Sequence, residues 1–174
     1  MNTLRRGVVR SVAAGLLLAS LTAALTGCGF KLRSSQNFAF QTLAVTPEKG
    51  GLVATDVIRY FGNTIVPLQP APGGVPPQVI LDILHDLREK TVVGVNATGQ
   101  VREFQLKIRV KFRLRTPQGN ELIAPTEITQ QRDIAFNESA VLAKEAEEVL
   151  LYRDMQNDIV QQLLRRVASV KQID

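Results

Sequence analysis

The stretch REFQLKIRVKFRLRT (residues 102–116) has the clearest pattern in the chain and decides the fold class. From residue 104 to residue 115, apolar side chains alternate with polar or basic ones. Because successive side chains of a β-strand point to opposite faces, the stretch predicts one long strand with an apolar face and a basic face. The cations of the basic face are Lys107, Arg109, Lys111, Arg113 and Arg115.

Turn sequences on both sides predict that this strand is the middle one of a three-stranded meander. NATGQ (96–100) and TPQGN (116–120) supply the Asn, Gly and Pro residues that tight turns require. Strands are therefore expected over 78–95 and 121–136. Pro125 interrupts the second of these, which favours an edge strand or a β-bulge at that position.

Upstream of the meander, the sequence predicts a short strand, a helix and a loop. A strand over 40–45 ends before Pro47, and 51–63 has apolar residues at helical spacing followed by a Gly-Asn stop. The segment 66–78 contains five prolines and two glycines, which is too many for a regular element. It is also too short for a second domain.

The C-terminal segment predicts one long amphipathic helix of about thirty residues, or about 45 Å. Asn137 or Ser139 can cap its start, and Arg165, Arg166 and Lys171 lie near its end, where cations suit the helix dipole. We expect its apolar residues to form a single packed stripe. They are Leu142, Ala146, Val149, Tyr152, Met155, Ile159, Leu163, Val167 and Val170.

This order of elements predicts an α+β fold. Two amphipathic helices can cover one face of a four-stranded mixed sheet and so form a two-layer sandwich. The hydrophobic fraction of 45% is sufficient for a core, and the charged fraction of 21% is too low for a disordered chain. We expect one domain over 28–174, preceded by a cleaved segment over 1–27.

The first 27 residues have the pattern of an export signal. Arginines precede an apolar run over 12–25 that is too short to span a bilayer comfortably. The sequence Leu25-Thr26-Gly27-Cys28 is similar to a lipobox, where cleavage before the cysteine accompanies its acylation. We therefore expect diacylglycerol and an N-acyl chain on Cys28, which hold the protein on a membrane, and no other cofactor. The alternative is a buried free thiol.

Removal of the signal changes the charge of the chain. It leaves 147 of the 174 residues and takes away three arginines but no acid, so the formal net charge falls from +5 to +2. The protein after cleavage is nearly balanced, and its cations are concentrated on the strand over 102–116.

Patterns of catalytic and metal-binding residues are missing from the sequence. His85 is the only histidine and lies within a strand pattern, while Gly94 and Gly99 bracket a turn and not a phosphate loop. Glu147 and Glu148 are adjacent on a helix and point in different directions. The sequence therefore favours a non-enzymatic protein over a membrane-anchored hydrolase.

The basic strand face has three interpretations. It can be the solvated face of a half-buried sheet, a surface for an anionic ligand or partner, or a row of charges that prevents edge pairing. If Arg115 lies opposite Glu121, the same register puts Glu127 opposite Arg109. The cations then left without an acid on the returning strand are Lys107, Lys111 and Arg113. For an exported, anchored chain, an anionic glycolipid or an acidic protein wall is the expected ligand, and nucleic acid is not.

Three segments of the chain are similar to one family. GCGFKLR (27–33) matches its lipidated start, and GQVREFQLKIRVKFRL (99–114) matches its central strand pair. RDIAFNESAVLAKEAEEVLLYRDMQNDIVQQLLRRV (132–167) matches its last strand and long helix. Together these segments resemble LptE, the family of lipopolysaccharide-assembly lipoproteins.

The resemblance implies a protein without enzymatic activity in the outer membrane. LptE proteins lie inside the β-barrel of LptD, and the pair places lipopolysaccharide in the outer leaflet. The expected partners are therefore LptD and lipopolysaccharide, with the chain lipid-anchored, periplasm-facing and inside the barrel. Gly29 agrees with this address, because an aspartate after the lipidated cysteine is the usual inner-membrane retention signal. The alternative is a periplasm-facing accessory of another envelope transport or barrel-assembly complex.

The resemblance also implies a lipid site. Lys144 matches a basic residue of the family that is implicated in lipopolysaccharide binding. The family's other basic position falls in the turn before the central strand, where 96–100 has no cation and Arg102 is the nearby substitute. The strand cations complete the expected lipopolysaccharide or partner surface: Lys107, Arg109, Lys111, Arg113 and Arg115.

Overall fold

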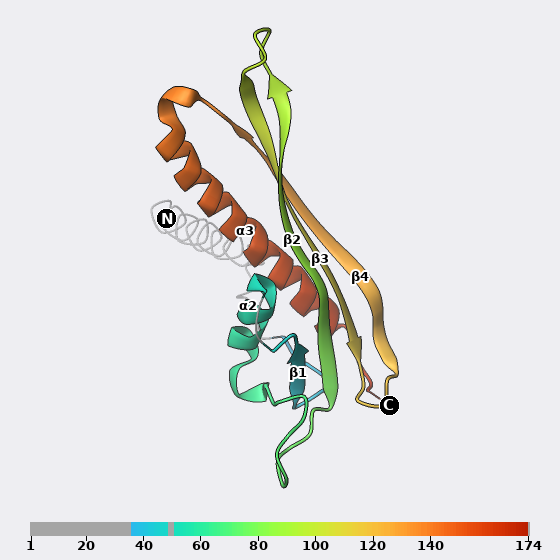
Figure 1. Cartoon of the computed structure of the whole chain (residues 1–174). Helices are drawn as coiled ribbons and strands as arrows, with labels where there is room; N and C mark the ends of the chain where they lie inside the picture. The colour runs from blue at the N-terminus through green and yellow to red at the C-terminus, as the bar shows by residue number, and fades with distance from the viewer. Residues whose placement is uncertain (1–35, 49–50, 174) are drawn as a thin grey trace, which may run out of the picture. The chain divides into compact units, whose positions relative to one another are not determined.

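The computed structural model describes residues 36–48 and 51–173 (Figure 1). Cys28, the expected signal over 1–27 and the segment up to residue 35 lie outside the described residues. The elements in chain order are β1 (Leu43–Thr46), α2 (Leu52–Phe61), the 3₁₀ turn η1 (Gly62–Thr64), β2 (Val79–Val95), β3 (Val101–Arg115), β4 (Glu121–Ala135), the 3₁₀ turn η2 (Glu138–Ala140) and α3 (Val141–Ala168).

The four strands form one mixed sheet in the order β1-β2-β3-β4. Strand β1 pairs parallel with β2, and the pairs β2–β3 and β3–β4 are antiparallel. The strand expected over 40–45 is observed at Leu43–Thr46, with Phe40 buried just before it. The predicted meander and the predicted mixed sheet are therefore confirmed.

The core lies between the sheet and the two helices, which cover the same face of it (Figure 1). The alternation of β3 explains this arrangement, because its inward side chains are almost completely buried. They are Leu106, Ile108, Val110, Phe112 and Leu114. Burial of each such side chain stabilises the fold by about 1.5–3 kcal/mol relative to exposure. The α+β sandwich that the sequence predicts is thus the observed fold.

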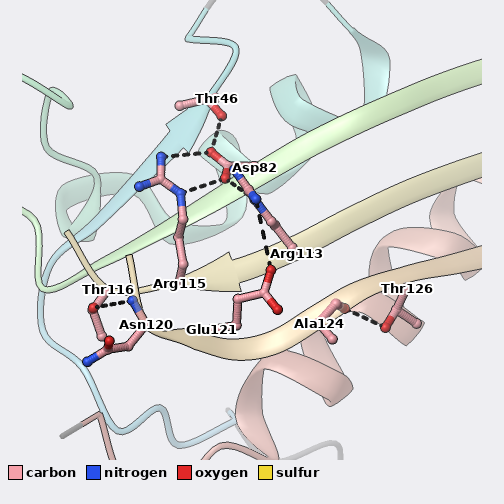
Figure 2. Close-up of polar contacts among 9 residues, drawn as sticks. All are labelled: Thr46, Asp82, Arg113, Arg115, Thr116, Asn120, Glu121, Ala124 and Thr126. Carbon is pink, nitrogen blue, oxygen red and sulfur yellow. Dashed lines mark hydrogen bonds and ion pairs between the residues drawn. The ribbon is translucent and has the colours of Figure 1, made fainter. Parts of the chain in front are cut away.

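Pro125 lies in a bulge of the edge strand β4, as its sequence position predicts. Between Thr126 and Ile123, the two residues Ala124 and Pro125 stand opposite the single residue Arg113 of β3. The Thr126 hydroxyl donates a hydrogen bond of 2.7 Å to the Ala124 carbonyl within this bulge (Figure 2). A proline is tolerated here because it cannot donate to a ladder.

A second irregularity changes which side chains of β2 face the helices. The pairing of β2 with β3 shifts between Ile83 and His85. Beyond this shift, the residues of β2 opposite the buried Val110, Ile108 and Leu106 are charged: Asp86, Arg88 and Lys90. Arg88 lies 5.2 Å from the ring centroid of Tyr152 in α3, and the Tyr152 hydroxyl donates to the Glu89 carbonyl at 2.8 Å. The distal half of β2 therefore joins α3 through polar contacts.

Helix α3 starts after η2, whose own start is capped by Asn137. The Asn137 side chain accepts a hydrogen bond of 3.0 Å from the backbone N–H of Ser139. Asn137 therefore caps η2 and not α3. The α-helix begins four residues later at Val141, after Ala140, and has no side-chain cap, so the predicted cap of the long helix is wrong.

The single apolar stripe predicted for α3 is wrong over its first half. Its buried residues all lie in the second half: Met155, Ile159, Val160, Leu163, Leu164 and Val167. In the first half, Leu142 is 82% exposed and Val149 is 67% exposed. The 17 residues from Leu142 to Ile159 leave the two side chains about 100° apart at 100° per residue. The predicted stripe joined residues three or four positions apart, so the rotation accumulated along the helix without being visible at any single step.

Candidate functional site

The outer face of β3, away from the helices, carries the five predicted cations. All five side chains are partly exposed, while the residues between them are buried. The two faces of the strand are therefore divided as the alternation predicts. Which of these cations can act on a ligand depends on the acids of the neighbouring strands.

Two of the cations converge on one buried carboxylate of β2 (Figure 2). Arg113 Nε donates to Asp82 Oδ2 at 2.7 Å, and Arg115 Nε donates to the same oxygen at 2.8 Å. The Thr46 hydroxyl donates to Asp82 Oδ1 at 2.6 Å. Burial alone would raise the pKa of Asp82, but the hydrogen bonds from Arg115, Thr46 and Arg113 outweigh it and hold the pKa below 3.8.

The third arginine is also paired. Arg109 forms an ion pair with Glu89 of β2, and its hydrogen bond to that carboxylate raises the pKa of Arg109. The sequence does not indicate how β2 pairs with β3, so the contacts of these arginines with Glu89 and Asp82 were not predicted. These two acids neutralise much of the charge on the strand.

The predicted register between β3 and β4 is correct at one end and wrong at the other. Arg115 lies opposite Glu121, as predicted. Glu127 lies opposite Lys111, whereas Arg109 faces Thr129. The two irregularities of β4 add two residues to that strand, which moves the pairing of Glu127 from Arg109 to Lys111.

The two lysines of the face differ from the arginines. Lys107 lies opposite Glu89 and Lys111 opposite Glu127, but neither forms an ion pair within residues 36–48 and 51–173. His85, opposite Lys111 on β2, is exposed as expected for a solvated strand residue. Any anion bound to this face would therefore meet these two lysines first.

Lys144 lies in a different place, in a groove between the start of α3 and strands β2, β3 and β4. The groove has a volume of about 240 Å³. Its walls are mostly apolar and include Phe104, Ile134, Phe136 and Val141. The rings of Phe104 and Phe136 meet edge to face, with centroids 5.2 Å apart. The groove therefore combines an ammonium group with an aromatic and aliphatic surface.

The second cation that lines this groove is Lys90 of β2. Its Nζ lies 2.6 Å from Glu148 Oε2 and 4.3 Å from the centroid of the Phe104 ring. Lys144 Nζ lies 2.8 Å from Glu147 Oε2. The sequence did not predict Lys90 as a residue of this site. The irregularity after Ile83, which turns the Lys90 side chain toward α3, cannot be recognised in the sequence of β2.

Arg102 does not line the groove. Its side chain is exposed, and its backbone carbonyl accepts a 2.7 Å hydrogen bond from the N–H of Phe136. Its role as a substitute for the family's second basic position stays a prediction.

Two features are absent from the part of the chain that the structure describes: a membrane-spanning helix and a cluster of metal ligands. None of its helices is long and apolar enough to cross a membrane. Its His, Cys, Asp and Glu residues form no cluster of three or more that could hold a metal ion.

Comparison with known proteins identifies the family. The sequence matches the LptE family, described as lipopolysaccharide-assembly, over residues 37–167. This chain belongs to the LptE family. The match includes the whole sheet, the groove and α3 up to Val167, so the predicted resemblance is confirmed.

Two relatives have the same family name. The LPS-assembly lipoprotein LptE of Photorhabdus laumondii is 26% identical over 159 residues, which cover 89% of this chain and 85% of the relative. The LPS-assembly lipoprotein LptE of Yersinia enterocolitica is 28% identical over 167 residues, which cover 89% of this chain and 75% of the relative. The chain is thus a member of a family of envelope lipoproteins in lipopolysaccharide assembly.

Solved structures share the fold. The solution structure of lipoprotein B from Nitrosomonas europaea has a TM-score of 0.65 and 35% identity, and the match covers 81% of this chain and 91% of that one. The crystal structure of rare lipoprotein B from Shewanella oneidensis has a TM-score of 0.55 and 24% identity, with coverage of 74% and 92%. The second likeness concerns the fold alone.

Proposed function

We propose that this protein is the non-enzymatic partner of the LptD β-barrel in the outer membrane. Lipids on Cys28 anchor it to the periplasmic side of that membrane. The protein plugs the barrel from within and binds lipopolysaccharide on its way to the outer leaflet. Membership of the LptE family and the described fold support this proposal.

The observation that carries the proposal is the groove that contains Lys144. Lipopolysaccharide combines phosphates with acyl chains, and a site for it needs cations beside an apolar surface. The groove offers Lys144 and Lys90 next to Phe104, Phe136 and Val141. An ammonium group binds phosphate as a point charge, and the apolar walls can cover hydrocarbon.

The outer face of the sheet is the second surface of the proposal. Its arginines are held by Asp82 and Glu89, so Lys107 and Lys111 are the cations that can turn to a partner. We assign this face to the barrel wall or to lipid phosphate. Arg109, Arg113 and Arg115 contribute mainly by joining β3 to β2 through Glu89 and Asp82.

Affinity purification of the lipidated protein from membranes tests the proposal. A large outer-membrane barrel should co-purify with it, and lipopolysaccharide should be present in the complex. A Cys28→Ala variant should lose the anchor, which provides the control for membrane attachment. Co-purification with another envelope assembly and no lipopolysaccharide would favour the accessory role and overturn the proposal.

A further inference from the structure

Strand β4 is the edge of the sheet on the side away from β1. From Thr126 to Ala135, its pairing with β3 has no irregularity. The hydrogen bond from the Phe136 N–H to the Arg102 carbonyl shows which backbone groups are directed toward β3. Because this direction alternates along a strand, the even-numbered residues over 126–136 bond to β3 and the odd-numbered ones direct their N–H and C=O groups outward. The outward residues are Glu127, Thr129, Gln131, Asp133 and Ala135.

The outward backbone groups of β4 are largely free. Arg166 of α3 donates to the Glu127 carbonyl at 3.5 Å, and Arg132 donates to the Gln131 carbonyl at 3.1 Å. Among the described residues, no strand other than β3 pairs with β4, whose outer edge is open along one side of the sheet (Figure 1). The segment 127–135 also contains neither proline nor lysine, which commonly prevent pairing at edge strands. Its backbone is therefore available to a further strand.

We propose that a second copy of this chain pairs with this edge. The two β4 strands run antiparallel, with Gln131 of one copy opposite Gln131 of the other, and join the two sheets into one. Gln131 is the central residue of 127–135, so this register uses the whole regular part of the edge. The bulge before Thr126 limits the pairing at one end, and the end of the strand at Ala135 limits it at the other. The pairing needs neither lipid nor a barrel, so it does not depend on the proposed function.

The side chains of β4 favour this register and this partner. Outward residues must lie opposite one another, so the register can shift only in steps of two residues. A shift in one direction puts Glu127 opposite Asp133, and a shift in the other puts Arg132 opposite Arg132. Like charges directly opposite each other are destabilising. The proposed register has no such pair and places apolar residues together; its opposite pairs are Ile128–Ile134, Gln130–Arg132, Thr129–Asp133, Glu127–Ala135 and Gln131–Gln131.

Sedimentation of the full lipidated protein in a neutral detergent tests the pairing, which should appear as a concentration-dependent equilibrium between monomer and dimer. Gln131→Pro removes the outward N–H at the centre of the pair, and an edge strand tolerates a proline there because that N–H makes no bond to β3. The variant should keep the circular dichroism spectrum of the wild type and dimerise at least about tenfold more weakly, the effect of losing one hydrogen bond. Gln131→Ala keeps the N–H and is the matched control, which should dimerise as the wild type does.

Single cysteines test the register. Gln131→Cys places two thiols directly opposite each other, with Cα atoms about 5.5 Å apart, which suits a disulfide. Thr129→Cys, on the same face of the same edge, places the two thiols four residues apart along the strands, or about 14 Å, which is too far. Oxidation should therefore cross-link Gln131→Cys and not Thr129→Cys. The wild type, whose only cysteine is Cys28, is the control.

Each result contradicts or supports the pairing. A wild type that sediments as a monomer at every soluble concentration would overturn it. A dimer that Gln131→Pro leaves unchanged must form through another surface, with the same consequence. Cross-linking of Thr129→Cys in preference to Gln131→Cys would show that the register is wrong. If the wild type alone is monomeric and Gln131→Pro loses a co-purifying barrel, the edge binds a strand of another protein and not a second copy. None of these results overturns the proposed function.

Discussion

Asp86 of β2 caps the helix that Leu52 begins: its Oδ2 accepts the backbone N–H of Leu52 at 2.8 Å. The same oxygen accepts the N–H of Val53 at 3.0 Å. The residue before the helix is Gly51, which has no side chain to provide a cap and has φ of 80°. A carboxylate 34 residues away in sequence thus satisfies the free N–H groups of α2 and complements the positive end of its dipole.

Asp86→Ala should therefore destabilise the fold. Loss of an N-terminal cap costs about 1 kcal/mol, with a range of about 0.5–2 kcal/mol. Unfolding in urea, followed by circular dichroism, measures the change. Asp154→Ala, an exposed acid in α3, is the control and should change the free energy of unfolding by less than about 0.5 kcal/mol. Equal stability of the two variants would contradict the capping role.

Asp82 should give the protein a pH-dependent stability. Its pKa in the folded protein is below the ordinary value of 3.8, so the ionised form is stabilised by folding. This contribution is fully present well above pH 3.8 and is lost as the pH falls through the lower folded-state pKa. The measurement is the urea midpoint of wild type and Asp82→Asn between pH 7 and pH 2.5. The variant should be less stable at pH 7, by about 1–3 kcal/mol, and the difference should shrink in acid.

Lys107→Glu combined with Lys111→Glu should weaken the association with the barrel or with lipopolysaccharide while the fold survives. Both side chains are partly exposed and form no ion pair in the described part of the chain, so their replacement leaves no acid stranded. Co-purification from membranes and a thermal melt measure the two effects. Unchanged binding with both charges reversed would assign this face to solvent.

Arg113→Glu belongs to a different class of variant. It places a second acid beside the buried Asp82 and removes a 2.7 Å hydrogen bond to it. We expect a loss of stability in addition to any effect on binding, seen as a lower midpoint of unfolding. A variant with unchanged stability would show that Arg115 and Thr46 alone are sufficient to hold Asp82.

The two halves of α3 should respond differently to the same substitution. Leu163→Ala removes a fully buried side chain and should cost about 2–5 kcal/mol. Leu142→Ala changes a side chain that is exposed and should cost less than about 0.5 kcal/mol. Thermal unfolding of the two variants measures both. A large loss in Leu142→Ala would mean that the first half of the helix packs as the sequence pattern suggested.

Most of the features that the sequence predicts correctly depend on one element at a time. The alternation in β3 determines which side is buried, because a strand has a fixed period of two. Pro125 marks an irregularity in β4 for a similar local reason. The resemblance to the LptE family also depends on contiguous sequence segments and not on contacts between elements.

Features that depend on how two elements meet could not be predicted. The pairing of Glu127 depends on two extra residues in β4, of which only the proline leaves a trace in the sequence. The orientation of Lys90 depends on the shift after Ile83, and the cap by Asp86 depends on the place of β2 beside α2. The candidate site was the least predictable feature, because the groove forms only where α3 meets strands β2, β3 and β4.

Under the proposed function, the ion pairs of Lys90 and Lys144 also affect how the lipid is released. A lysine without an acidic neighbour would bind a phosphate more strongly, and its positive charge would be left uncompensated when the lipid departs. Here a carboxylate already stands within reach of each ammonium group, at 2.6 and 2.8 Å. Departure of the proposed lipid would therefore return Lys90 and Lys144 to their own carboxylates and leave neither ammonium group without an acid. Under the proposed function, this groove would bind lipid less tightly than two unpaired lysines would, and it would release the lipid faster.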